Sequence, residues 1–191
     1  MLKKKKMLEK IAEKLSDALL GIVRTTGKIT GEAVNIIKAT LKIALEGVED
    51  IGSKSFEIGI NAIKGGIKGI SGVGITLIEA AHDLVKAVVE GVVGAGGDVV
   101  GTTKGAIEAS IKGAAELGEN VAEVAVKAVQ GAIEGTKTVG GDVAKVTKEA
   151  VLEAIRTAEE IGSETGSAVK EALKGTIEGA KEIIETPFKK E

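Results

Sequence analysis

The sequence contains no cysteine, tryptophan or tyrosine, and its only aromatic residues are Phe56 and Phe188. The absence of cysteine excludes a disulfide framework and thiolate metal sites, although it does not fix the cellular compartment. With so few aromatic side chains, any core must consist mainly of valine, isoleucine and alanine, which form a thin and smooth apolar surface. The net charge of −2 provides no overall basic field, so we expect no nucleic-acid partner.

Long apolar runs are absent as well. Met1–Lys10 begins with the positive charge of a signal peptide, but charged residues interrupt the apolar stretch that should follow. No window approaches the ~18 uninterrupted apolar residues that are needed to span a bilayer. We therefore expect a soluble or peripheral protein that is, by default, cytoplasmic.

A unit of 22 residues repeats along the chain, as in GAIEGTKTVGGDVAKVTKEAVL from Gly131 to Leu152. Such a period must be recognised before any motif search, because it decides the class of fold. Residues 1–20 form a Lys-rich helical lead-in that shares the phase of the repeat. Residues 21–186 form the continuous repeat region. Residues 187–191 form a C-terminal tail, since Pro187 cannot continue a helix.

The period favours helices over strands. Twenty-two residues equal two 11-residue hendecads, and a hendecad closes in three turns at about 3.67 residues per turn. One face can therefore stay apolar over a great length, whereas the strict alternation of a strand is absent. We predict an all-α protein with long amphipathic helices that are near-straight or form a slightly right-handed supercoil. One apolar lane of this face consists of Leu41, Ile63, Val85, Ile107, Val129, Val151 and Leu173.

Glycine is unusually frequent, with 27 copies, and each glycine inside a helix costs about 0.5–1 kcal/mol relative to alanine. Two lanes at 22-residue spacing lie at the edges of the apolar face, where we expect them to allow close helix contacts. The first lane is Gly47, Gly69, Gly91, Gly113, Gly135 and Gly179, and the second is Gly52, Gly74, Gly96, Gly118, Gly140 and Gly162.

The same glycines allow an alternative in which the helix breaks at regular intervals. Gly96-Gly97-Asp98 and Gly140-Gly141-Asp142 match a helix C-cap followed by an N-cap aspartate. The equivalent segments Gly118-Glu119-Asn120 and Gly162-Ser163-Glu164 are weaker breakers, so a continuous helix is the favoured interpretation. Regular breaks would instead produce a helical bundle or an α-solenoid.

One polar lane alternates in sign without exception, which lengthens the true repeat to 44 residues. A neighbouring helix shifted by one unit would place each cation beside an anion, although duplication of a 44-residue ancestor explains the alternation equally well. A repeat of this length also matches the two-helix unit of HEAT-type solenoids. The lane consists of Arg24, Glu46, Lys68, Glu90, Lys112, Glu134, Arg156 and Glu178.

Catalytic constellations are missing. His82 is the only histidine, and we expect it to be a solvated side chain at the edge of the polar face. Asp83 alone does not supply the further ligands that a metal ion requires. None of the serines has a histidine within a helical turn to act as its base. We therefore expect neither an enzyme nor a cofactor or metal site.

Val146-Thr147-Lys148-Glu149-Ala150-Val151 is similar to the KTKEGV motif of synucleins, and Val139–Val143 is similar to their apolar glycine–valine stretch. In its periodicity the whole chain resembles synucleins, perilipin-type droplet-coat proteins and helical late-embryogenesis proteins. The resemblance implies a helix that lies along a lipid surface with its apolar half buried. The chain departs from this pattern because acidic and basic residues are mixed across its polar face.

Three functions follow from these patterns. The favoured one is a structural protein whose long helices assemble with other copies of the chain into a bundle, sheath or filament. An amphipathic coat for a lipid surface, droplet or granule is the first alternative, since lipid requires no close side-chain packing. The second alternative is an α-solenoid interaction scaffold.

Overall fold

The computed structural model describes residues 2–26, 29 and 31–186, and this part of the chain contains helices and no strand. The prediction of an all-α protein is therefore confirmed. The described helices are α1 (Leu2–Thr26), α2 (Gly31–Leu45), α3 (Ile51–Ser71), α4 (Leu77–Gly94), α5 (Val99–Leu117), α6 (Val121–Thr138), α7 (Val143–Ile161), α8 (Ser163–Thr176) and α9 (Ala180–Glu185). Residues 187–191, predicted as a tail, lie outside the described residues.

In the centre of the chain, each 22-residue unit folds into one helix and one turn. The four central helices, α4 to α7, begin at Leu77, Val99, Val121 and Val143. A glycine in the left-handed region lies in the turn before each of them, a conformation that ends a helix and that other residues rarely adopt. These glycines are Gly74, Gly96, Gly118 and Gly140, with φ values of 77°, 96°, 69° and 71°. The favoured interpretation of one continuous helix is therefore wrong, and the alternative of regular breaks is correct.

A polar N-cap restarts the helix after each of these glycines. The side chain of Asp98 accepts a hydrogen bond from the backbone N–H of Gly101, and that of Asp142 accepts one from Lys145. Thr76 and Asn120 cap α4 and α6 in the same way. Because an N-cap of this kind stabilises a helix by about 1 kcal/mol, even the segment Gly118-Glu119-Asn120 is a sufficient breaker.

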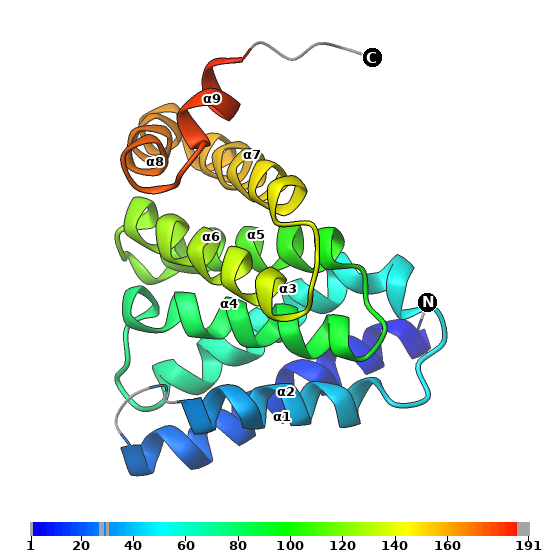
Figure 1. Ribbon diagram of the computed structural model, residues 1–191. Helices are drawn as coiled ribbons and strands as arrows, with labels where there is room; N and C mark the ends of the chain where they lie inside the picture. The colour runs from blue at the N-terminus through cyan, green and yellow to red at the C-terminus, as the bar shows by residue number, and fades with distance from the viewer. Residues whose placement is uncertain (1, 27–28, 30, 187–191) are drawn as a thin grey trace.

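The helices stack in two layers (Figure 1). Helices α1, α3, α5 and α7 pack side by side in one layer, while α2, α4, α6 and α8 form the other. The two helices of each pair, α1–α2, α3–α4, α5–α6 and α7–α8, also contact each other and form a helical hairpin, and α5 and α7 begin 44 residues apart, at Val99 and Val143. Hairpins stacked in this way have the architecture of a short α-solenoid. The 44-residue period is therefore the length of one hairpin.

The core lies between the two layers. Every residue of the apolar lane that begins at Leu41 and ends at Leu173 has 0% exposure. These side chains alternate between the layers because successive members belong to successive helices. This lane of the repeat is thus buried against other helices of the same chain. Within the described residues, no helix combines the length and the apolar character needed to cross a membrane.

Candidate functional site

Four glycines of the first predicted lane lie directly against the neighbouring helix of their own layer. A Cβ atom added to Gly91 would lie 2.8 Å from Cδ1 of Leu41, and one added to Gly113 would lie 2.5 Å from Cδ1 of Ile67. Gly69 and Gly135 make similar approaches, which lets the helices pack closely. The lane's two end members differ, since Gly47 and Gly179 have positive φ values and no atom within 4 Å of an added Cβ.

The second glycine lane does not make the helix contacts that we expected. Added Cβ atoms would meet nothing within 4 Å at the helix-ending glycines, and at Gly162 only Thr165 Oγ1 lies near, at 3.9 Å. At Gly74, Gly96, Gly118 and Gly140 the lane falls in turns, where the positive φ and not the space for a side chain favours glycine. The members without a contact are Gly52, Gly74, Gly96, Gly118 and Gly140.

The closest helix contacts involve other glycines, which the sequence lanes missed. Gly105 of α5 faces Phe56 of α3, where an added Cβ would lie 2.0 Å from the carbonyl oxygen. Gly65 and Gly131 approach Ala12 and His82 at 2.3 Å and 2.2 Å in the same manner. One signal could have revealed part of this set, because Gly65, Ala87, Ala109 and Gly131 form a lane of small residues at 22-residue spacing.

The two signs of the alternating charge lane lie in different layers of the fold. Its cations lie on the odd-numbered helices, whereas its anions lie on the even-numbered helices or directly after them. Neighbouring helices of one layer therefore carry the same sign, and among the described residues no two members of the lane form an ion pair. Each paired member bonds to a charge outside the lane, as in the 2.8 Å contact between Lys38 Nζ and Glu90 Oε2. The odd members are Arg24, Lys68, Lys112 and Arg156, and the even members are Glu46, Glu90, Glu134 and Glu178.

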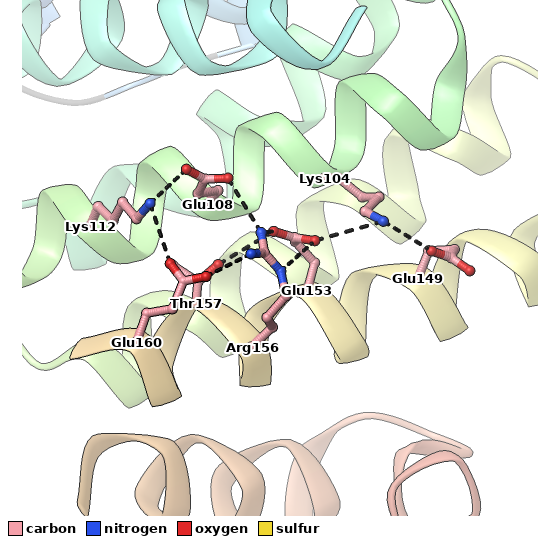
Figure 2. A network of polar contacts seen from close by, with 8 residues as sticks. All are labelled: Lys104, Glu108, Lys112, Glu149, Glu153, Arg156, Thr157 and Glu160. Carbon is pink, nitrogen blue, oxygen red and sulfur yellow. Dashed lines mark hydrogen bonds and ion pairs between the residues drawn. The ribbon is translucent and has the colours of Figure 1, made fainter. Parts of the chain in front are cut away.

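The most extensive polar cluster joins α5 to α7 (Figure 2). Glu153 of α7 is only 3% exposed and accepts hydrogen bonds from the guanidinium of Arg156. Glu108 of α5 bonds to Lys112 at 2.7 Å and to Arg156 at 3.5 Å. Lys112 also reaches Glu160 of α7 at 3.5 Å. We call this cluster the α5/α7 network.

The charges of the α5/α7 network are bound to one another. The hydrogen bond to Glu153 raises the pKa of Arg156, and the hydrogen bond to Glu108 raises the pKa of Lys112. Both cations therefore stay charged throughout the physiological range. The network holds α7 against α5, and Thr157 completes it with a hydrogen bond to Glu153.

A second cluster joins α4 to α6 around His82. Its Nδ1 lies 2.8 Å from Asp83 Oδ1, and its Nε2 lies 3.0 Å from Glu134 Oε2. Lys86 also bonds to Glu134. Both ring nitrogens can donate only when the imidazole is protonated, and the hydrogen bond with Asp83 is the largest cause that raises the pKa of His82. We expected His82 to be solvated, but its ring bonds to two carboxylates and its side chain is only 29% exposed.

A groove of about 630 Å³ lies beside this histidine. It runs between α6, the start of α7 and the turn after α8, and its wall includes Lys137, Thr147 and Glu178. Across the described residues, no group of three or more histidine, cysteine, aspartate or glutamate side chains is arranged to hold a metal ion.

Apolar exposure is concentrated at helix ends. Ile43, at 62% exposure, lines a groove of about 660 Å³ with Ala39, Val48 and Ala95 near the ends of α2 and α4. Leu117 and Ile161 are 45% and 40% exposed at the ends of α5 and α7.

Comparison with known proteins adds no relative: the chain matches no protein-family model, no curated protein and no solved structure. The function must therefore be inferred from the surfaces that the fold presents.

Proposed function

We propose that the protein is a non-enzymatic interaction scaffold of the α-solenoid type. The observation that carries this proposal is the complete burial of the apolar lane from Leu41 to Leu173 inside the chain. Side chains that already pack against one another are unavailable to a lipid surface or to the long helices of other copies. The outside of the stack carries most of the charged residues of the repeat, and solenoids use such repeated outer surfaces to bind partners.

The distribution of charge supports the same function. The lane's cations belong to one layer and its anions to the other, so within this lane the two layers carry charges of opposite sign. Complementary charge patterns favour selective and rapid association with a partner. The separation follows from the 44-residue repeat, since every hairpin places the same sign on the same layer.

Far-UV circular dichroism and light scattering test the proposed scaffold together. A scaffold should be strongly helical in plain buffer, with a helicity and a molar mass that do not change over a wide range of concentrations. Addition of lipid vesicles should leave the helicity unchanged. A chain that becomes helical only with vesicles would contradict the proposal and support the lipid-coat function instead.

Self-assembly is the second candidate, and the exposed apolar groove around Ile43 favours it specifically. An exposed isoleucine in a groove at the first hairpin provides a surface on which another copy could pack. Growth of the molar mass with concentration, abolished by Ile43→Glu, would support this function over a monomeric scaffold. The variant Leu117→Glu is the matched control, because Leu117 is exposed at a different helix end.

A further inference from the structure

A third groove, of about 340 Å³, lies between α3 and α5, in the layer of the odd-numbered helices. Lys64 and Lys68 of α3 line one wall, and Lys112 of α5 lines the other. Lys64 and Lys68 are exposed, and neither forms an ion pair with any described residue. We call this feature the α3/α5 groove. Its free cations distinguish it from the neutralised network one hairpin further on.

The α3/α5 groove and the α5/α7 network occupy equivalent places in successive hairpins. Residues of the groove correspond to residues of the network 44 positions later in the sequence. Lys68 and Lys112 of the groove correspond to Lys112 and Arg156 of the network, so the cations are retained. Lys64 stands at the position of Glu108, while Ala109 and Gly113 stand at the positions of Glu153 and Thr157.

These replacements remove the carboxylates of Glu108 and Glu153 and keep the cations, while the network's Glu160 keeps a carboxylate counterpart in Glu116. In the network, Glu108 and Glu153 hold the guanidinium of Arg156 between them (Figure 2). In the groove, Lys64 adds a positive charge where Glu108 would neutralise one, and Ala109 leaves space where Glu153 would stand. The network therefore indicates which group would complete the groove, namely a carboxylate that binds to its lysines.

We propose that the α3/α5 groove binds an acidic segment of a protein partner. Its carboxylates contact Lys64 and Lys68, in the manner of the internal glutamates of the α5/α7 network. An apolar side chain beside these carboxylates packs against Ile67 and the exposed Leu117, which line the same groove. This assignment rests on the proposed scaffold function and names the chemistry of its partner.

An acidic peptide fits this groove better than a nucleic acid does. Glu116 lines the groove beside Leu117, and it would repel the continuous phosphates of a nucleic-acid strand. No aromatic side chain lines the groove to stack against a base. A peptide can instead place separate carboxylates on the lysines and an apolar residue near Leu117.

Fluorescence anisotropy with a labelled glutamate-rich peptide that contains one leucine tests the assignment on the full chain. We expect saturable binding at low salt that weakens as salt is added. The double variant Lys64→Glu/Lys68→Glu should weaken binding about tenfold or more, because it reverses both contacting charges. The single variant Lys64→Glu places a glutamate in the groove at the position that Glu108 occupies in the network. It should reduce binding while keeping the helicity of the wild type.

The charge-matched control is Lys127→Glu/Lys148→Glu, which changes two exposed lysines on α6 and α7. Equal loss of binding in the control would overturn the assignment, since it would mean non-specific attraction. The assignment also fails if a single-stranded oligonucleotide displaces the peptide and binds more tightly. If the wild type is a helical monomer that does not bind the peptide, the groove assignment fails alone. If it polymerises or needs lipid to fold, the scaffold function fails.

Discussion

Gly131 of α6 lies so close to His82 of α4 that an added Cβ atom would stand 2.2 Å from the His82 carbonyl oxygen. Real Cβ atoms do not approach a carbonyl oxygen at this distance, so the two backbones can meet only because this position lacks a side chain. The same contact brings the ring of His82 within reach of Glu134, one turn along α6. Helix spacing and the polar cluster are therefore coupled at this point.

The variant Gly131→Ala should destabilise the fold by about 2–3 kcal/mol, because the methyl group forces α6 away from α4. Gly175→Ala is the matched control at the equivalent position two units later, where an added Cβ meets nothing within 4 Å. This control should be neutral or stabilising by about 0.5 kcal/mol. Urea unfolding followed by circular dichroism measures both. Equal stabilities of the two variants would contradict the close contact.

Much of the fold follows from the sequence. The apolar lane from Leu41 to Leu173 was recognisable from its spacing, and it forms the core. The segments Gly96-Gly97-Asp98 and Gly140-Gly141-Asp142 also carried the signals of a helix end and a helix start. What the sequence did not decide was whether each glycine serves a turn or a contact, since the residue type sets neither φ nor the distance to a neighbour.

The pairing of charges was less predictable than the fold. The sign alternation of the charge lane is visible in the sequence, but its partners depend on which helices are neighbours. Each helix stacks on the helix two positions later, so Lys112 meets Glu160 and not an anion of its own lane. The burial of Glu153 was equally unpredictable. This residue interrupts a lane of glycine and alanine, and no local feature of the sequence indicates that it is buried.

The N-caps provide a test of the turns between units. Asp142→Ala should destabilise the protein by about 1 kcal/mol, since the backbone N–H of Lys145 then loses its partner. Asp142→Asn should retain most of the stability, because an asparagine side chain can accept the same hydrogen bond. Thermal unfolding of the two variants separates them. Identical losses would assign the effect to the charge and not to the cap.

The contact between Lys38 and Glu90 joins α2 to α4 and predicts a non-additive pair of substitutions. Glu90 is 7% exposed, and its Oε1 atom is buried without a hydrogen-bond partner, so Lys38 provides its main compensation. Lys38→Met should therefore destabilise the protein by about 1–2 kcal/mol. The double variant Lys38→Met/Glu90→Leu should be more stable than this single variant, because no unpaired charge remains. A double-mutant cycle from urea unfolding measures the coupling. Additive effects would contradict it.

His82 predicts how stability depends on pH. Its pKa is raised above the ordinary value of 6.5 by the hydrogen bond with Asp83, and Glu134 adds to this effect, although partial burial opposes it. Folding therefore favours the imidazolium. The resulting stabilisation is complete below about pH 6.5 and is lost as the pH rises through the higher folded-state pKa.

The free energy of unfolding, measured between about pH 6 and pH 9, should accordingly fall more in the wild type than in His82→Gln. The comparison is specific because His82 is the only histidine in the chain. The neighbouring charges of Lys86 and Glu134 do not titrate in this range, since their hydrogen bond raises the pKa of the lysine and lowers that of the glutamate. Parallel pH profiles for the two proteins would show that the imidazolium does not link α4 to α6.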